Sequence, residues 1–192
     1  MGKVGVLALQ GAFREHGEVL DALGVETTEI RTPEHLAGID VLVMPGGEST
    51  TMGMLLESSG LRAPIGERLR DDMPVLGTCA GLILLATNIA DGRPDQMSFG
   101  VLDAAVRRNA YGSQLASFEA SLEVDGLVGG RFPGVFIRAP VVEAVGDGVT
   151  VLAQHDGHPV LLRQGRIWAS TFHPELSGDL RIHERFISEV MR

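Results

Sequence analysis

The chain contains a single cysteine, Cys79, with a glycine two residues before it and another two residues after it. The segment Gly77-Thr78-Cys79-Ala80-Gly81 has the spacing of a nucleophile elbow, a sharp turn that presents a reactive side chain between a strand and a helix. A side chain at either glycine would strike that strand or helix. The start of a helix also favours a thiolate, because its dipole and free N–H groups are positive there. We therefore interpret Cys79 as a nucleophile rather than a buried structural cysteine, the usual alternative for a free thiol.

A histidine and a carboxylate follow the last predicted strand, residues 167–171, and precede a predicted closing helix over residues 178–192. The imidazole of His173 can take the thiol proton and later give a proton to a leaving group, and Glu175 can fix the tautomer of that ring. We therefore predict a triad of Cys79, His173 and Glu175. A histidine without such a partner is usually structural, and we interpret in that way His16, His35, His155, His158 and His183.

The loop Pro45-Gly46-Gly47-Glu48-Ser49-Thr50-Thr51 directly follows a predicted strand at residues 41–44. Its glycines would let backbone N–H groups face a ligand, and Ser49 or Thr50 would cap the next helix. A simple strand-to-helix turn has the same features, so both interpretations stay open. The loop lacks the Gly-Lys-Ser/Thr ending of a P-loop, which disfavours nucleotide binding.

Arginines end two of the later predicted strands. Arg108 and Arg138 could each hold a carboxylate, because a guanidinium binds that group in a bidentate fork. Most arginines instead lie in solvent, and we expect that of Arg131, Arg163 and Arg166.

These side chains need a scaffold that brings distant strand ends together. Apolar runs at residues 3–9, 25–30 and 41–44, and the run that leads to Cys79, alternate with helical patterns at 12–23, 61–70 and 82–86. This alternation predicts a mostly parallel, doubly wound α/β sheet that binds ligands beyond the carboxyl ends of its strands. Residues 88–98 have the composition of a loop. The short runs beyond it predict hairpins that extend the sheet with antiparallel strands; they are residues 100–106, 115–124, 134–138, 141–145, 149–154, 159–163 and 167–171.

Composition restricts the class of protein. A chain of 192 residues that is 44% hydrophobic suits one domain over residues 1–192. The net charge of −9 and the lack of a basic run argue against nucleic-acid binding. One cysteine excludes an internal disulfide, and no apolar run approaches the length of a signal peptide or membrane span. We therefore expect a cytoplasmic protein with no membrane partner.

The same residues give a resemblance to a known family. The chain resembles the class I glutamine amidotransferases, which use a Cys-His-Glu triad, through Gly77 to Gly81 and His173-Pro174-Glu175. Within them it is similar to the glutaminase subunits of pyridoxal 5′-phosphate synthase. That narrower resemblance rests on seven segments in order, namely Leu7 to Ala12, Arg14 to His16, Pro45 to Thr51, Arg108-Asn109, Ser117 to Ala120, Gly134 to Pro140 and Phe172 to Leu176. The chain departs from the family at Ala110-Tyr111, where Ser-Phe is usual, and in the loop from Asp91 to Phe99.

The resemblance implies a fold and a set of roles. The fold would be a three-layer α/β/α, flavodoxin-like domain without metal or cofactor. Cys79 would attack the side-chain amide of L-glutamine while His173, oriented by Glu175, moves the protons. Backbone N–H groups of Gly47 and Ala80 would hold the oxyanion. The glutamine site would consist of Gly47, Glu48, Ser49, Arg108, Ile137 and Arg138.

The resemblance also implies a partner. Ammonia would pass to a separate synthase subunit with the fold of a β/α barrel, which makes pyridoxal 5′-phosphate within a large hetero-oligomer. Pyridoxal 5′-phosphate would be a product there and not a cofactor of this chain. We expect the Gly46-Gly47 loop to be completed only when that partner docks, with Gln10 near the contact.

Three other functions fit parts of the sequence. One is the glutaminase subunit of another amidotransferase, such as imidazole glycerol phosphate synthase, which shares the triad but not the Leu-Gln-Gly-Ala start or Phe-Ile-Arg-Ala-Pro. The second is a stand-alone cysteine hydrolase of γ-glutamyl compounds, which would be active without a partner. The third is a non-catalytic binding module, for which replacement of Cys79 would have no effect.

Overall fold

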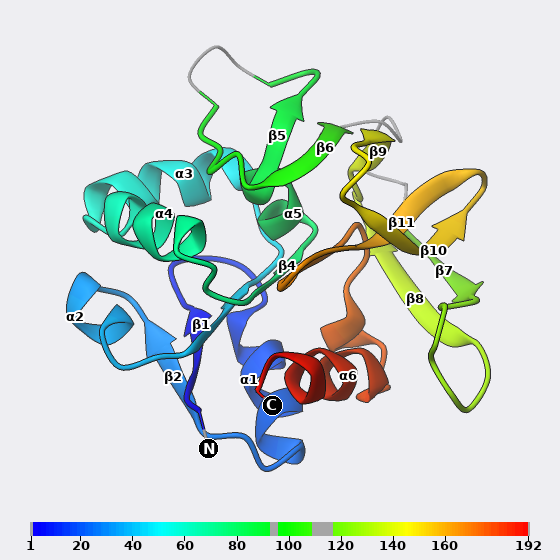
Figure 1. Cartoon of the computed structure of the whole chain (residues 1–192), viewed down its shortest axis with the longest axis horizontal. Helices are drawn as coiled ribbons and strands as arrows, with labels where there is room; N and C mark the ends of the chain where they lie inside the picture. The colour runs from blue at the N-terminus through cyan, green and yellow to red at the C-terminus, as the bar shows by residue number, and fades with distance from the viewer. Residues whose placement is uncertain (1, 93–95, 109–116, 192) are drawn as a thin grey trace.

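The apolar runs of the sequence form a seven-stranded central sheet with the strand order β10-β11-β12-β4-β3-β1-β2 (Figure 1). The computed structural model describes residues 2–92, 96–108 and 117–191. From β2 to β12 every neighbouring pair is parallel, and β11 and β10 add antiparallel strands at one edge. The predicted mostly parallel sheet with antiparallel extensions is confirmed. Its strands are β1 (Val4–Leu7), β2 (Thr27–Ile30), β3 (Val41–Met44), β4 (Val75–Thr78), β10 (Thr150–His155), β11 (His158–Gln164) and β12 (Ile167–Ser170).

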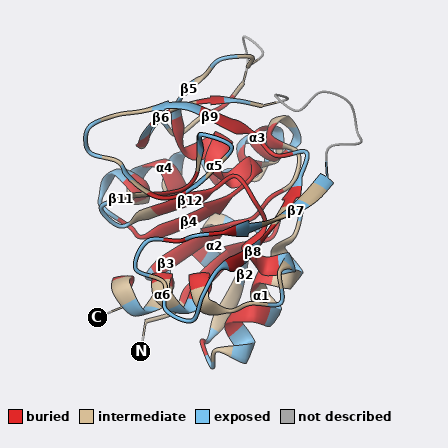
Figure 2. Ribbon diagram, turned by 90° about the vertical axis from the view of Figure 1, so that its right-hand side faces the viewer, coloured by how far each residue is buried: buried red, intermediate tan, exposed pale blue. Residues whose placement is uncertain are grey.

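Helices cover both faces of this sheet and complete a three-layer α/β/α arrangement (Figure 2). One face packs against α1 (Phe13–Ala22) and α6 (Arg181–Val190), and the other against α3 (Ser49–Ser58), α4 (Arg62–Arg70) and α5 (Ala80–Leu85). The short helix α2 (Pro33–Leu36) lies beside β2. Strand β3 shows why both faces are covered, because Leu42 and Met44 join one hydrophobic cluster while Val41 and Val43 join the other.

Two smaller sheets correct part of the prediction. Strands β5 (Ala86–Ile89), β6 (Leu102–Arg107) and β9 (Val141–Val145) form a separate three-stranded sheet, and β7 (Ser117–Leu122) and β8 (Phe132–Ile137) form a two-stranded one. Apart from Val124, which forms a single bridge with Ala153 of β10, the described residues of these runs therefore do not extend the central sheet. Phe132 and Phe136 of β8 pack instead onto Phe172, which draws that hairpin to one face of the molecule. Such packing depends on tertiary contacts that local sequence patterns do not contain.

The segment around residue 86 differs from its predicted structure. Helix α5 begins at Ala80 and ends at Leu85, whereas the apolar pattern predicted a helix over residues 82–86. Ala86 instead opens β5, which extends into the predicted loop and pairs in parallel with β6. This four-residue strand has a mixed burial pattern and a partner distant in sequence, so no local alternation marks it.

The turn between β4 and α5 has the steric character predicted for an elbow. Cys79 adopts a left-handed backbone conformation with φ of 49°. A Cβ atom on Gly81 would lie 2.2 Å from the carbonyl oxygen of Met44, and one on Gly77 would lie 2.9 Å from the carbonyl carbon of Gly81. Strand, turn and helix therefore approach so closely that neither glycine can carry a side chain without backbone movement.

Replacing Gly81 by alanine tests this close approach. We expect Gly81→Ala to lower the free energy of unfolding by about 1–3 kcal/mol, the usual cost of overpacking. Gly17→Ala is the matched control, because nothing lies within 4 Å of a Cβ atom at that helical position. For Gly17→Ala we expect the free energy of unfolding to rise by about 0.5–1 kcal/mol. Urea denaturation measures both, and equal effects would contradict the steric explanation.

Candidate active site

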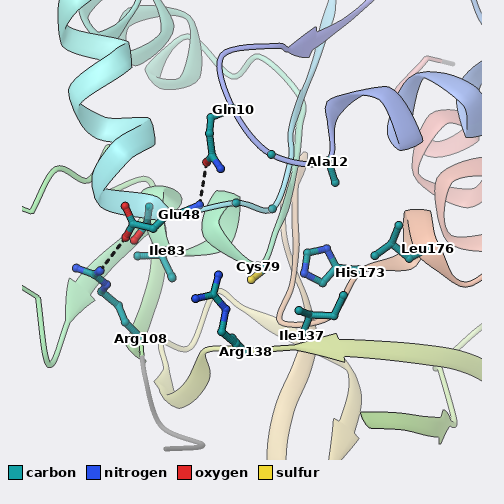
Figure 3. Close-up of a pocket in the computed structure, with 14 residues that line it drawn as sticks. Gln10, Ala12, Glu48, Cys79, Ile83, Arg108, Ile137, Arg138, His173 and Leu176 are labelled. Carbon is teal, nitrogen blue, oxygen red and sulfur yellow. Dashed lines mark hydrogen bonds and ion pairs between the residues drawn. The ribbon is translucent and has the colours of Figure 1, made fainter. Parts of the chain in front are cut away.

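Strands β4 and β12 lie side by side and bring the cysteine and the histidine to the same edge of the sheet. They pair in parallel, with Thr78 opposite Ser170, and the backbone N–H of Cys79 donates to the carbonyl of Ser170 at 2.8 Å. The backbone N–H of His173 donates to the carbonyl of Val135 at 2.8 Å, which ties the histidine segment to β8. Cys79 and His173 thus open into one cavity of about 360 Å³ at the carboxyl ends of the strands, within the range of small-molecule sites (Figure 3).

Glu175 lies behind His173 and orients its ring. Nδ1 of His173 lies 2.7 Å from Oε1 of Glu175, which sits in the single-turn 3₁₀ helix η1 (Pro174–Leu176). Because a carboxylate can only accept, this nitrogen is the donor and leaves Nε2 of His173 for Cys79. Cys79, His173 and Glu175 are each only 6% exposed, so the three side chains interact away from bulk water.

Burial and charge oppose each other in this group. Burial alone would lower the pKa of His173, but the interactions of the ring with Cys79 and Glu175 outweigh it and raise that pKa to about 10. Burial alone would raise the pKa of Glu175, yet His16 and His173 lower it below the ordinary value. The arrangement therefore favours an imidazolium held between a sulfur and an ionised carboxylate.

The glycine loop after β3 forms the opposite wall of the cavity. Oε1 of Gln10 accepts from the backbone N–H of Glu48 at 2.9 Å, and the carbonyl of Gly46 accepts from the N–H of Ala12 at 3.0 Å. A Cβ atom on Gly46 would lie 2.4 Å from Cε1 of His173. Only glycine lets this backbone approach the imidazole so closely.

The cap of α3 is a residue that the sequence did not indicate. The carboxylate of Glu48 accepts from the N–H groups of Thr50 at 3.2 Å and Thr51 at 2.6 Å, whereas we predicted Ser49 or Thr50 as the cap. Helix α3 already begins at Ser49, so the extended residue before it takes the capping position. The helix dipole and this hydrogen bonding keep the Glu48 side chain at the cavity wall.

The two candidate arginines differ in what they contact. The guanidinium of Arg108 lies 3.2 Å from Oε1 of Glu48 and also donates to Gln96. Arg138 has a left-handed backbone with φ of 44°, and its side chain reaches into the cavity toward Cys79 (Figure 3). Within the ranges that the structure describes, the Arg138 guanidinium has no ion pair. Strained backbone at both Cys79 and Arg138 is typical of functional sites.

The structure brings most of the predicted site residues into this one cavity. Its lining includes Gly47, Glu48, Ser49, Cys79, Arg108, Ile137, Arg138 and His173. Two predicted site residues are not part of the lining. Ala80 is the first residue of α5, and Glu175 lies behind His173. Asn109 and the Ala110-Tyr111 departure lie outside the described residues.

Several cavity and supporting residues were not predicted. Ile83 lines the cavity one helical turn after Cys79, a position that helical periodicity could have indicated. Ala12 and Leu176 also belong to the lining, together with Gln10, Gly11 and Gly46. His16 and His183 lie fully buried behind Glu175, although we interpreted both as merely structural. The signal for His16 is its place on the buried face of α1 beside Val19 and Leu20, where a polar ring requires a partner.

The fold and the cavity together define the class of protein to which the chain belongs. A mostly parallel sheet, a cysteine at a strand–helix elbow and a His-Glu pair at the next strand end are the arrangement of class I glutamine amidotransferases. A crystal structure titled a glutamine amidotransferase superposes with a TM-score of 0.92 at 52% identity, covering 98% of this chain and 99% of that one. A putative GMP synthase protein from Thermoplasma acidophilum shares the fold at 19% identity, with a TM-score of 0.70 over 100% of this chain and 94% of that one.

Sequence comparison narrows the class to one family. The chain belongs to the SNO glutamine amidotransferase family, whose family model matches residues 6–192. A curated relative from Mycobacteroides abscessus, named pyridoxal 5′-phosphate synthase subunit PdxT, is 54% identical over 187 residues. That match covers 97% of this chain and 96% of the relative.

Two further observations concern membrane-spanning helices and metal sites. Among the described residues no helix has the length and apolar character needed to cross a membrane. The same residues contain no group of three or more His, Cys, Asp or Glu side chains arranged to hold a metal ion.

The buried histidines make stability depend on pH. Burial lowers the pKa of His183 to about 3, whereas an unfolded histidine titrates near 6.5. Between these values the unfolded chain binds more protons, so stability is present above about pH 6.5 and is lost as the pH falls toward 3. We expect His183→Gln, which keeps an N–H donor but does not titrate, to make the fall shallower by up to about 1.4 kcal/mol per pH unit. Urea denaturation across about pH 4–6 measures this slope, and parallel profiles would contradict the assignment.

Proposed function

We propose that this chain is the glutaminase subunit of a pyridoxal 5′-phosphate synthase, which hydrolyses L-glutamine and delivers the ammonia to a synthase subunit. The observation that carries the proposal is the His173–Glu175 hydrogen bond at 2.7 Å beside Cys79 in the cavity. The printed name of the 54% identical relative supports the choice of synthase. We take residues 1–192 as one catalytic domain, and the single cysteine favours a cytoplasmic location.

The triad performs the reaction in two steps. The thiolate of Cys79 attacks the side-chain amide carbon of glutamine, and a tetrahedral oxyanion forms. The imidazolium of His173 gives its Nε2 proton to the amide nitrogen, so the C–N bond breaks, ammonia leaves and a γ-glutamyl thioester remains. The neutral ring then takes a proton from water, which attacks the thioester and releases glutamate and the thiolate. Glu175 stabilises the imidazolium and keeps Nε2 directed at the reacting atoms.

The backbone N–H groups of Gly47 and Ala80 are the donors that we assign to the oxyanion. Ala80 is the first residue of α5, where N–H groups lack partners within the helix. Gly47 follows the Gly46 carbonyl, which the N–H of Ala12 holds at 3.0 Å. Any rotation of the Gly46–Gly47 peptide must break that hydrogen bond, so the segment from Gln10 to Ala12 controls one of the two donors.

A partner that contacts this segment can therefore switch the enzyme on. Ammonia released without an acceptor would be protonated in water and lost, so activity that requires the synthase subunit conserves glutamine. We propose that this partner, with the fold of a β/α barrel and within a large hetero-oligomer, docks over the mouth of the cavity. Ile137 and Leu176 are 37% and 39% exposed there, which gives the mouth an apolar rim.

Partner dependence is the first test of the proposed function. We expect addition of the synthase subunit to raise ammonia release from L-glutamine by about 100-fold, the effect of completing one oxyanion donor. Cys79→Ala should lose more than about 10³-fold in rate with or without the partner. Equal wild-type rates with and without the partner would contradict the switch and favour a stand-alone hydrolase.

Arg138 is the residue that we assign to the α-carboxylate of glutamine. Its guanidinium enters the cavity without an ion pair among the described residues, whereas Glu48 already engages Arg108. Losing a charged hydrogen-bond partner costs about 1.5–3 kcal/mol, or roughly 10- to 100-fold in affinity.

Replacing Arg138 and Arg108 one at a time tests which of them binds the carboxylate. We expect Arg138→Ala to raise the KM for glutamine by roughly 10- to 100-fold with a smaller effect on kcat. Arg107→Ala is the control, because that exposed side chain pairs with Glu143 and does not line the cavity. An unchanged KM in Arg138→Ala, together with a raised KM in Arg108→Ala, would move the carboxylate site to Arg108.

A further inference from the structure

Two buried histidines contact each other behind the triad. Nδ1 of His16 on α1 lies 2.9 Å from Nε2 of His183 on α6, and both side chains are 0% exposed. Nε2 of His16 lies 3.1 Å from Oγ1 of Thr78, the residue before Cys79, and 3.4 Å from Oε2 of Glu175. The pair therefore touches both the strand that carries the nucleophile and the carboxylate that orients His173.

The second oxygen of Glu175 makes this contact important. Oε1 takes the hydrogen bond from His173, whereas Oε2 is fully buried and has no hydrogen-bond partner among the described residues. A buried carboxylate oxygen that lacks a donor costs free energy and leaves the carboxylate free to rotate about its own axis. Nε2 of His16, at 3.4 Å, is the nitrogen placed to limit both effects.

The tautomers of the two rings follow from their surroundings. If Nε2 of His16 carried a lone pair, it would face the negative Oε2 of Glu175, which is repulsive. Nε2 of His16 is therefore protonated: it donates to Oγ1 of Thr78 and turns its positive side to Oε2 of Glu175 at 3.4 Å, and Nδ1 accepts from Nε2–H of His183. Nδ1 of His183 then keeps a lone pair and has no partner among the described residues, which is less costly than an orphaned N–H.

Burial favours the neutral form of the His16 ring. Burial lowers the pKa of His16, and the ring faces Glu175, His173 and His183 as well as the neighbouring Glu15 on its own helix. Glu175 and Glu15 oppose the effect of burial, while His173 adds to it. A neutral donor at this point lets Glu175 keep its full negative charge for the His173 imidazolium, instead of sharing that charge with a second cation.

We propose that His16, held in one tautomer by His183, is a positioning residue that fixes the Glu175 carboxylate and through it the His173 ring. This role rests on the proposed glutaminase function, but the geometry behind it does not depend on the substrate. His16 acts only through Glu175, so its effect requires an intact carboxylate there.

Kinetics of the complex with the synthase subunit test this coupling. We expect His16→Leu to lower the kcat for ammonia release about 10-fold or more with little change in KM, and His16→Gln, which keeps an N–H donor, to recover most of that loss. In a Glu175→Gln background the additional effect of His16→Leu should vanish. A His16→Leu effect of equal size in both backgrounds would overturn the proposal, because a merely structural role adds independently. His158→Gln, at an exposed position on β11, is the control for loss of a histidine.

Spectroscopy of the chain itself separates this proposal from the proposed function. The Nδ1 proton that His173 donates to Glu175 should give a downfield NMR signal in a histidine-labelled sample, as expected for a short charge-assisted hydrogen bond. We expect His16→Leu to shift or broaden this signal and His16→Gln to restore it. An unchanged signal in a folded His16→Leu variant would overturn the proposal, even if the wild-type complex releases ammonia. A shifted signal would support the proposal, even if the wild-type complex releases none.

Discussion

Parallel pairing of β4 with β12 brings Cys79 and His173, which are far apart in sequence, to adjacent strand ends. The N–H of Cys79 bonds the last residue of β12, so the elbow and the histidine segment share one hydrogen-bond ladder. Because a shift of one residue would turn each side chain to the other face, the register of this pair decides whether the site exists. The apolar clusters on both faces hold the register, and the glycines of the elbow let strand and helix meet.

Burial of charge is the second constraint. A carboxylate as enclosed as Glu175 remains ionised only if its oxygens face donors or positive charge, and the protein supplies His173 on one side and His16 on the other. These donors come from the segment after β12 and from α1, with α6 supporting α1 through His183. The helices that pack one face of the sheet thus also complete the electrostatic environment of the site, so folding and reactivity depend on the same contacts.

The sequence was informative where local patterns carry the information. Strand-length apolar runs located β1, β3 and β12, and the glycine spacing located the elbow, because sterics demand glycine there. The sequence was uninformative where contacts between distant segments decide strand pairing and side-chain packing. The pairing of β5 with β6, the packing of Phe136 on Phe172 and the contact of His16 with Glu175 all join residues separated along the chain. The sequence pattern also does not show how far a side chain reaches. Glu48 caps α3 although serine and threonine residues follow it directly.

The central claim is that Cys79 carries the glutamyl group during turnover. Mixing the complex of this chain and its synthase subunit with L-glutamine, quenching in acid and mapping the peptides by mass spectrometry would test that claim most directly. We expect one γ-glutamyl adduct on the peptide that contains Cys79, and none in Cys79→Ala. Ammonia release without any adduct on Cys79, or an adduct on another residue, would contradict it.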